Sequence, residues 1–184
     1  RIFHKLTKNT YIPPGMMTIK QLSKKLYSLY ANKTPISRSI IPIIISRLSG
    51  KGIGFSSIIS SFIDEVKQYC PRKDIETINK ELKSVFEELN VPEEGSKRAM
   101  ETIEIFRKYQ ETLTAQNLID ENDVMTECPA IIKEHNYSPA ILILDGFYEI
   151  TPSEELILKS LIEQAGTTLI SIPYDDNFTL ITNS

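Results

Sequence analysis

Asp145 is the residue of this sequence whose position most clearly indicates a ligand-binding or catalytic role. It follows a short continuous apolar run, Ile141–Leu144, which is typical of a strand buried on both faces of a parallel sheet. A carboxylate there lies at the carboxyl end of the strand, where open α/β sheets place their ligand crevice. Gly146 follows and lets the backbone turn with a positive φ angle. The alternative is that Asp145 only hydrogen-bonds within a turn.

Other polar residues with suggestive spacing have simpler interpretations. Asp120 and Asp123 form a pair of carboxylates, but capping of a helix start accounts for both. Glu149 is interpreted as a solvated loop acid. His135 lies near a predicted helix end, where a cation is favoured, and the sequence offers it no catalytic partner. These residues therefore do not predict a catalytic group.

The residues after the apolar run predict a helix and a second strand. Residues 151–154, Thr-Pro-Ser-Glu, have the pattern of a capping box with proline at the first helical position. Apolar residues then recur at helical spacing as far as Gly166, which ends the helix. Residues 167–172 are predicted to form a second buried strand. Residues 138–184 therefore predict a parallel β-α-β unit.

Residues 1–137 show the helical spacing of apolar side chains and no strand pattern, so they predict a mainly helical subdomain. Thr18 is expected to cap its first clear helix and Asp120 its last. Pro42 fits only in the first turn of a helix. Residues 93–95 are a predicted break. The fold class is therefore α/β and predominantly helical, with predicted helices at residues 18–32, 38–48, 55–69, 74–89, 96–116 and 120–135.

Composition limits the class of protein. The 184 residues suffice for one domain of ordinary size, and 41% hydrophobic with 24% charged residues is typical of a soluble globular protein. No apolar run approaches the roughly 20 residues needed to span a membrane. Without a signal-peptide pattern, a cytoplasmic location is expected. Cys70 and Cys128 form no Cys-x-x-Cys pair, so both are interpreted as buried or inert thiols in a reducing cytosol.

Charge is unevenly distributed along the chain. Residues 1–63 contain ten Lys and Arg and no acid, whereas residues 64–184 contain eleven Lys and Arg and all 24 acids. This asymmetry predicts a basic region that faces a polyanion, and contact with DNA phosphates needs only basic side chains. The alternative is that the basic region packs on the acidic remainder or on an acidic neighbouring domain. The candidate positions are Lys20, Lys24 and Lys25 on one predicted helix, with Lys33, Arg38, Arg47 and Lys51 nearby.

Residues 142–152, Leu-Ile-Leu-Asp-Gly-Phe-Tyr-Glu-Ile-Thr-Pro, resemble the degenerate Walker B segment of the helicase-like B subunit in AddAB/RexAB-type helicase–nucleases. Two less specific stretches agree with this. Residues 106–124 resemble the helices before that strand, and residues 14–22 resemble a segment of the motor domain in which Thr18 opens a helix. The resemblance implies part of a superfamily I helicase-like motor domain of the P-loop NTPase type.

The resemblance also implies which functional positions of the active relatives Asp145 and Gly146 occupy. Active relatives have an Asp-Glu pair at this strand end, in which the aspartate holds Mg²⁺ and the glutamate positions the attacking water. Asp145 occupies the metal-type position, but Gly146 can neither accept a proton nor orient water. Tyr148 and Glu149 fall where active enzymes have Gln and Asp. A motor that has lost ATP hydrolysis is expected, with Mg²⁺ and ATP relevant only if the parent protein retains a live nucleotide site.

No Gly-x-x-x-x-Gly-Lys-Ser/Thr phosphate loop is present, and the glycines of residues 50–54 have the wrong spacing for one. In the resembled fold that loop would lie before Arg1, so the chain is expected to be a fragment of a longer protein. By resemblance, the parent would also have a PD-(D/E)xK nuclease domain, which these residues do not contain.

The function implied by the resemblance is DNA scaffolding in double-strand break repair. In the family, the inactive motor holds single-stranded DNA while a sister subunit supplies ATP-driven movement. The candidate DNA-binding residues are Thr18, Lys20, Lys24 and Lys25. Two alternatives remain, namely part of a live ATP-dependent helicase and a helical protein-interaction module without enzymatic activity.

Overall fold

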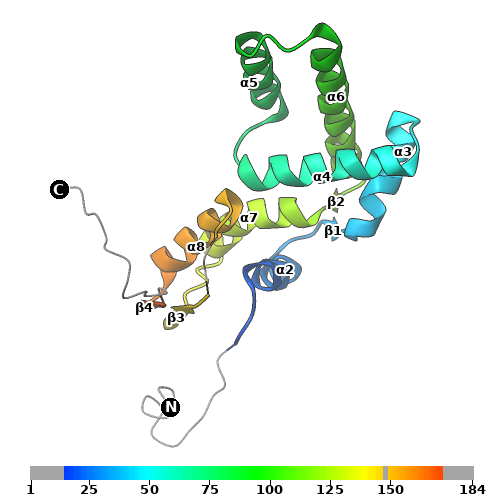
Figure 1. Cartoon of the computed structure of the whole chain (residues 1–184). Helices are drawn as coiled ribbons and strands as arrows, with labels where there is room; N and C mark the ends of the chain where they lie inside the picture. Colours follow the sequence, from blue (N-terminus) through cyan, green and yellow to red (C-terminus); the bar gives the residue numbers. More distant parts are fainter. Residues whose placement is uncertain (1–14, 147–148, 172–184) are drawn as a thin grey trace, which may run out of the picture.

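The computed structural model describes residues 15–146 and 149–171. Several parts of the predictions lie outside the described residues, namely Tyr148, residues 1–14 of the predicted helical subdomain, and residues 172–184 with the end of the second strand. Within them the chain is mostly helical, with two pairs of short parallel strands (Figure 1). The predominantly helical α/β class is therefore confirmed. None of the helices in these ranges has the length and apolar character that a membrane span requires.

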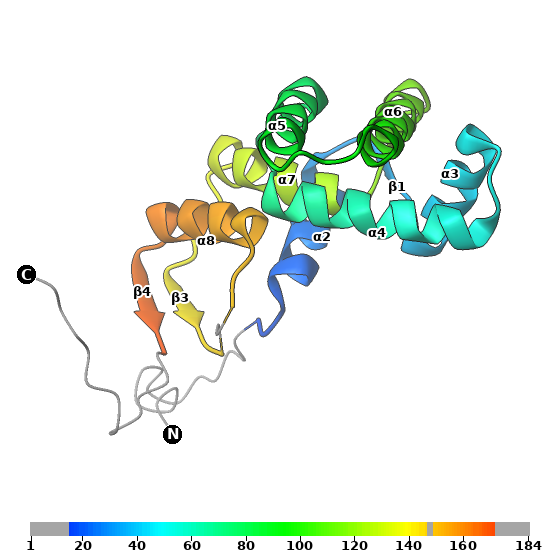
Figure 2. The same cartoon turned by 45° about the horizontal axis from the view of Figure 1, so that its top comes forward.

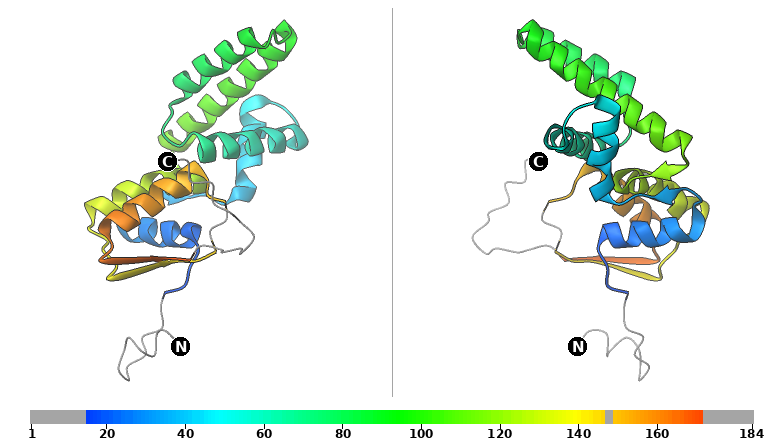
Figure 3. Two further views of the ribbon diagram at one scale, coloured as in Figure 1. Left: turned by 60° about the vertical axis from the view of Figure 1, so that its left-hand side comes forward. Right: turned by 90° about the vertical axis from the view of Figure 1, so that its right-hand side faces the viewer.

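The described residues form two units, and the second is inserted into the first. The base unit consists of α2 (Ile19–Tyr30), α7 (Glu121–Glu134), β3 (Ile141–Leu144), α8 (Pro152–Gln164) and β4 (Thr167–Ile170). The helical unit consists of the 3-10 helix η1 (Arg38–Ile40), α3 (Ile41–Ser49), α4 (Ile53–Tyr69), α5 (Ile75–Glu88) and α6 (Glu93–Ala115). Figures 1 and 2 show α4 lying between the α5–α6 pair and the base unit, and Figure 3 shows that pair projecting from the rest.

Each unit has its own apolar core. α2 and α7 lie within the predicted subdomain 1–137 and share a core with the β-α-β unit. The predicted boundary at residue 137 itself stays a prediction. The base core contains Leu26, Tyr27, Cys128, Ile132, Ile157 and Leu161. The core of the helical unit contains Ile45, Ile59, Ile63, Ile103, Phe106 and Leu113.

The helices of the base unit begin at the predicted caps. The Thr18 hydroxyl accepts a hydrogen bond from the Gln21 backbone nitrogen at 3.2 Å, and the Gln21 side chain accepts one from the Thr18 nitrogen at 2.9 Å. Thr151 and Glu154 make the same capping box at the start of α8, with Pro152 in its first turn. β3 and β4 pair in parallel along their whole length, which confirms the β-α-β unit.

The prediction that both strands are buried is wrong for the described residues. Side chains alternate along a strand, so Leu142 and Leu144 pack toward the base core, whereas Ile141 and Ile143 point to the opposite face. Ile143 is 41% exposed there, and Leu169, its partner in β4, is 46% exposed. No described residue covers that face, and a continuous apolar run does not by itself reveal whether both faces are covered.

The helical unit confirms the prediction at one helix start and departs from it at another. α3 begins at Ile41 after η1, so Pro42 lies in its first turn as the sequence predicts. α6 begins at Glu93, so residues 93–95 are helical and not a break, since Pro92 at the N-cap and two acids in the first turn favour a helix start. On α4, Ile59 and Ile63 are buried, whereas Ile58 is 68% exposed.

Two short strands connect the units. β1 (Thr34–Pro35) follows α2, and β2 (Leu118–Ile119) follows α6. They pair in parallel, with Thr34 opposite Leu118. In the described residues, the chain therefore passes between the units through two segments that lie side by side.

Candidate functional site

Asp145 lies where the sequence predicts, exposed at the carboxyl end of β3. Gly146 has a φ angle of +77°, a region that L side chains rarely adopt, so the backbone as well as the residue type disfavours a glutamate there. Glu149 is also exposed. Among the described residues, no group of three or more His, Cys, Asp or Glu side chains is placed to hold a metal ion. The metal-type role of Asp145 therefore stays a prediction.

The four predicted DNA-binding residues lie on α2 or at its start, but they differ in their surroundings. Thr18 is exposed and caps the helix. The Lys24 Nζ lies 2.9 Å from Glu121 Oε1 on α7, and this hydrogen bond lowers the pKa of Glu121. Lys20 and Lys25 are exposed and form no ion pair within the described part of the chain. Two of the three lysines are therefore available to a partner.

Two further cations of the basic region also pair with the acidic remainder. The Lys33 Nζ lies 2.6 Å from Glu127 Oε1, and the Arg38 guanidinium lies 2.7 Å from Asp64 Oδ2. Together with Lys24, they support the alternative interpretation for part of the basic region. Arg47 and Lys51, at the other end of the helical unit, are exposed and unpaired among the described residues.

The structure brings together a buried polar group that sequence reasoning missed. The Lys67 Nζ of α4 donates to Asp120 Oδ2 at 2.6 Å and to Asp123 Oδ2 at 2.8 Å. The Tyr109 hydroxyl donates to the same Asp120 oxygen at 2.9 Å, and the Gln110 amide donates to Asp123 at 2.9 Å. We call these five residues the Lys67 cluster. Asp120 is also the N-cap of α7, as predicted, since its other oxygen accepts from the Asp123 nitrogen.

The Lys67 cluster holds one cation between two carboxylates in a buried setting. The exposed fraction of the side chain is 7% for Lys67 and 2% for Asp120. Burial raises the pKa of Asp123, although the charge of Lys67 acts in the opposite direction. Burial and the nearby Asp120 also raise the pKa of Tyr109. The charged side chains of the cluster are thus paired with one another, and none of its carboxylates is free to act as a base.

A second contact lies one helical turn away on α4. Asp64 accepts hydrogen bonds from Arg38 at 2.7 Å and from the Asn122 amide at 2.8 Å. α4 therefore contacts the first turn of α7 at two points. A sequence signal for this contact exists, because polar residues recur at helical spacing beside the apolar stripe of α4, at Ser56, Ser60, Asp64 and Lys67.

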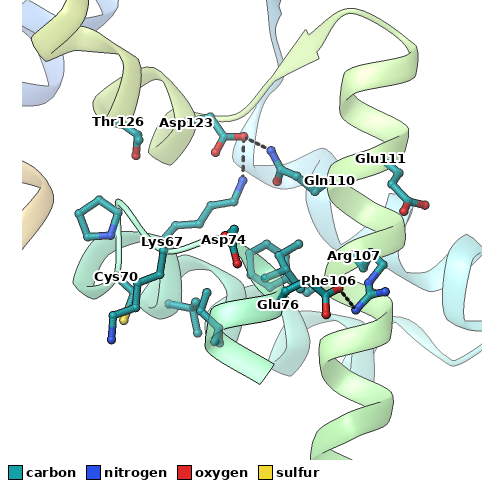
Figure 4. A pocket seen from close by; sticks show the side chains of 15 residues that line it. Lys67, Cys70, Asp74, Glu76, Phe106, Arg107, Gln110, Glu111, Asp123 and Thr126 are labelled. Atoms are coloured by element: carbon teal, nitrogen blue, oxygen red, sulfur yellow. Dashed lines mark hydrogen bonds and ion pairs between the residues drawn. The ribbon is translucent and has the colours of Figure 1, made fainter. Parts of the chain in front are cut away.

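A cleft of about 520 Å³ opens beside the Lys67 cluster. Lys67, Gln110 and Asp123 meet at one end of it, and Phe106 lies next to them (Figure 4). The opposite wall includes Glu76, which pairs with Arg107 at 2.7 Å. The Gln110 side-chain oxygen is buried without a hydrogen-bond partner. The cleft thus combines apolar and polar walls at the junction of α4, α5, α6 and α7.

Comparison with known proteins identifies the family. No curated protein matches the chain. Residues 47–183, more than half of the chain, match the family described as "ADDB, N-terminal". The match includes the Lys67 cluster and Asp145, whereas α2 lies before it. It agrees with the AddB-type resemblance of residues 142–152, and the chain belongs to the family "ADDB, N-terminal".

Proposed function

We propose that this chain is part of the AddB-type subunit of a DNA-repair helicase–nuclease, in which α2 binds single-stranded DNA through its phosphates. Family membership supports the first half of this proposal. The finer interpretation, a superfamily I helicase-like motor that works beside a sister subunit, rests on the resemblance of residues 142–152.

The exposed start of α2 is the observation on which the DNA-binding role depends. The free backbone N–H groups of a helix start favour an anion, and no acidic residue lies in the first turn of α2 to compete for them. Thr18 caps this start and leaves its hydroxyl hydrogen free to donate. Lys20 and Lys25 are exposed on the same helix. Phosphate contacts of this kind hold DNA without reading its sequence.

We also propose that the chain does not hydrolyse ATP. Gly146 stands where an active enzyme of the resembled family has the glutamate that positions water, and its positive φ angle would strain a side chain there. Purified protein is expected to release phosphate from ATP at the rate of a buffer control. Turnover well above that background would favour the live-helicase alternative.

A second candidate is a structural or protein-interaction role without DNA contact. The ion pairs of Lys24, Lys33 and Arg38 with acids of the same chain favour it, because these cations already have partners. In that case Lys20 and Lys25 would meet another part of the parent protein.

Binding to a fluorescent single-stranded oligonucleotide separates the two candidates. We would compare the native chain with Lys20→Glu/Lys25→Glu at low salt, by fluorescence anisotropy. The matched control is Arg47→Glu/Lys51→Glu, which makes the same charge change with exposed residues of the helical unit. The proposal predicts that binding is lost in the α2 variant and retained in the control. Equal loss in both variants would indicate only a response to net charge, and absence of native binding would favour the structural role.

A further inference from the structure

α4 has three faces, and the described residues cover only two of them. Ile59 and Ile63 pack into the apolar core of the helical unit, and Asp64 and Lys67 hydrogen-bond to α7. The third face is exposed although it is apolar. Because a helix at a protein surface normally exposes polar residues, an exposed apolar face is typical of a surface that contacts a partner.

The exposed face carries a stripe of large apolar side chains. Phe55, Ile58, Phe62 and Tyr69 recur at the spacing that places residues on one side of a helix. Ile58 is 68% exposed and Tyr69 is 62% exposed, whereas Phe62 is half-buried against the core of the helical unit. At 1.5 Å per residue, the stripe extends along about 21 Å of the helix axis. We call these four residues the α4 stripe.

The exposed charges near the α4 stripe are mostly basic. Arg47 and Lys51 precede its first residue, and Arg72 follows its last. All three cations are exposed, and none forms an ion pair within the described residues. Residues 1–63 contain no acid, so the only exposed acid of α4 is Glu65. Figures 1 and 2 show the turn between α3 and α4 at the end of the helical unit that lies farthest from β3 and β4.

We propose that the α4 stripe binds an acidic amphipathic helix of a partner protein. The apolar side of that helix lies along the stripe, and its carboxylates face Lys51 at one end and Arg72 at the other. Apolar residues at helical spacing are the anchors by which two amphipathic helices recognise each other. Gly54 and Ser61 are small and exposed beside the stripe, so they let a partner helix approach closely. Binding at the α4 stripe is independent of DNA binding by α2.

The charges favour an acidic partner over a second copy of this chain. Antiparallel pairing of two α4 stripes would bring Lys51 of one copy near Arg72 of the other, and parallel pairing would bring the two Lys51 side chains together. Either arrangement places like charges opposite each other, which is unfavourable.

The same charges disfavour DNA or an anionic membrane as the ligand of the stripe. Glu65 follows Phe62 by three residues and precedes Tyr69 by four, so it lies on the same side of α4 as the stripe. It would therefore face the phosphates of DNA or of a lipid surface. A partner helix can meet Glu65 with one basic or polar residue and still be acidic elsewhere.

The probe is a synthetic helical peptide of 17 residues, the length of α4. It has leucine along one face and glutamate with alanine on the others. Binding to the native chain is followed by fluorescence anisotropy of the labelled peptide. We expect saturable binding of this acidic peptide. We expect none of a version with lysine in place of glutamate, and none of a version with glutamine in place of leucine.

The variant Ile58→Gln/Tyr69→Gln tests the apolar contact. It removes the two most exposed side chains of the stripe and should weaken peptide binding by about tenfold or more. The matched control is Leu29→Gln/Leu89→Gln, which makes the same kind of change at exposed positions on α2 and at the end of α5. The control should bind the peptide as the native chain does, and circular dichroism checks that both variants keep their helices.

Charge reversal separates this proposal from DNA binding by α2. Arg47→Glu/Lys51→Glu should weaken binding of the acidic peptide and leave oligonucleotide binding in place. Lys20→Glu/Lys25→Glu should do the opposite. If only the first variant behaves as expected, the α4 stripe is supported and DNA binding by α2 is not, and the reverse result would leave DNA binding by α2 in place without the stripe.

The proposal is overturned if the native chain does not bind the acidic peptide, or if Ile58→Gln/Tyr69→Gln binds it as tightly as the native chain. Equal affinity for the acidic and the lysine peptide would also contradict it. A dimer in sedimentation equilibrium that is lost in Ile58→Gln/Tyr69→Gln would assign the stripe to a second copy instead. Binding of the oligonucleotide or of anionic vesicles that is lost in the same variant would assign it to nucleic acid or to a membrane.

Discussion

Lysines on two helices of this chain have opposite surroundings. Lys20 and Lys25 project from α2 into solvent, and no described acid pairs with them. Lys67 of α4 is buried between two carboxylates and lies 5.4 Å from the centre of the Tyr109 ring. The difference shows that the role of a lysine depends on the element opposite its helix. Lys20 and Lys25 remain available to a ligand, whereas Lys67 joins two parts of the protein.

The largest effect is expected from removal of the buried cation. Lys67→Met leaves the buried Asp120 and the half-buried Asp123 without their counter-ion, and breaking a buried pair from one side typically costs about 3–5 kcal/mol. We expect a loss of about 3 kcal/mol in the free energy of unfolding, at the lower end of that range, because Asp123 already has partial access to water. Urea unfolding followed by circular dichroism measures it.

Lys25→Met is the matched control for that experiment. It makes the same substitution at an exposed lysine with no ion pair in the described chain, and surface changes of this kind usually alter stability by less than about 0.5 kcal/mol. Equal losses in the two variants would remove the distinction between the two regions.

A medium effect is expected at the start of α2. Thr18→Ala removes the hydroxyl that accepts from the Gln21 nitrogen, and loss of such a cap typically costs about 1 kcal/mol. Thr18→Asn retains a capping oxygen and should restore most of that stability. Thermal unfolding of both variants measures the contribution of the cap to stability, apart from any DNA contact. Equal melting temperatures of Thr18→Ala and native protein would contradict a stabilising cap at Thr18.

The smallest effect is expected for Asp123→Asn, and its direction depends on pH. Burial raises the pKa of Asp123 above its ordinary value of 3.8, so the folded protein favours the protonated form more than the unfolded chain does. The stability contributed by this group is complete below pH 3.8 and is lost as pH rises through the folded pKa. Asparagine resembles the protonated form and avoids that loss.

Asp123→Asn should therefore match the native protein in strong acid and be at least as stable at neutral pH. Unfolding in urea at a series of pH values gives the comparison. A variant that becomes progressively less stable than the native protein as pH rises would show that the ionised Asp123 contributes net stability through Lys67.

Local patterns in the sequence predict much of this fold. The caps at Thr18, Asp120 and Thr151 and the turn at Gly146 are confirmed, because each depends on residues within a few positions. The prediction that β3 is buried on both faces is wrong, because an apolar run specifies a strand but not what covers each of its faces. Local information thus determines where elements begin and end more reliably than it determines their packing.

Local patterns do not predict the Lys67 cluster either, because its members lie far apart in the sequence. Asp120 and Asp123 were explained as caps, which is correct for Asp120, yet their cation lies 53 and 56 residues away in the sequence. The buried polar stripe of α4 gives a partial signal, since polar residues at helical spacing beside an apolar stripe indicate a second contact surface. The identity of the partner depends on the insertion of the helical unit between α2 and α7.

The salt dependence of binding to a single-stranded oligonucleotide tests the central claim most directly. Each phosphate contact adds roughly 0.7 to the slope of log K against log salt for single strands. If Lys20 and Lys25 each contact a phosphate, the slope for Lys20→Ala/Lys25→Ala should be shallower than the native slope by about 1.4. An equal slope in this variant and the native protein would contradict the account, because the exposed lysines of α2 would then not face DNA.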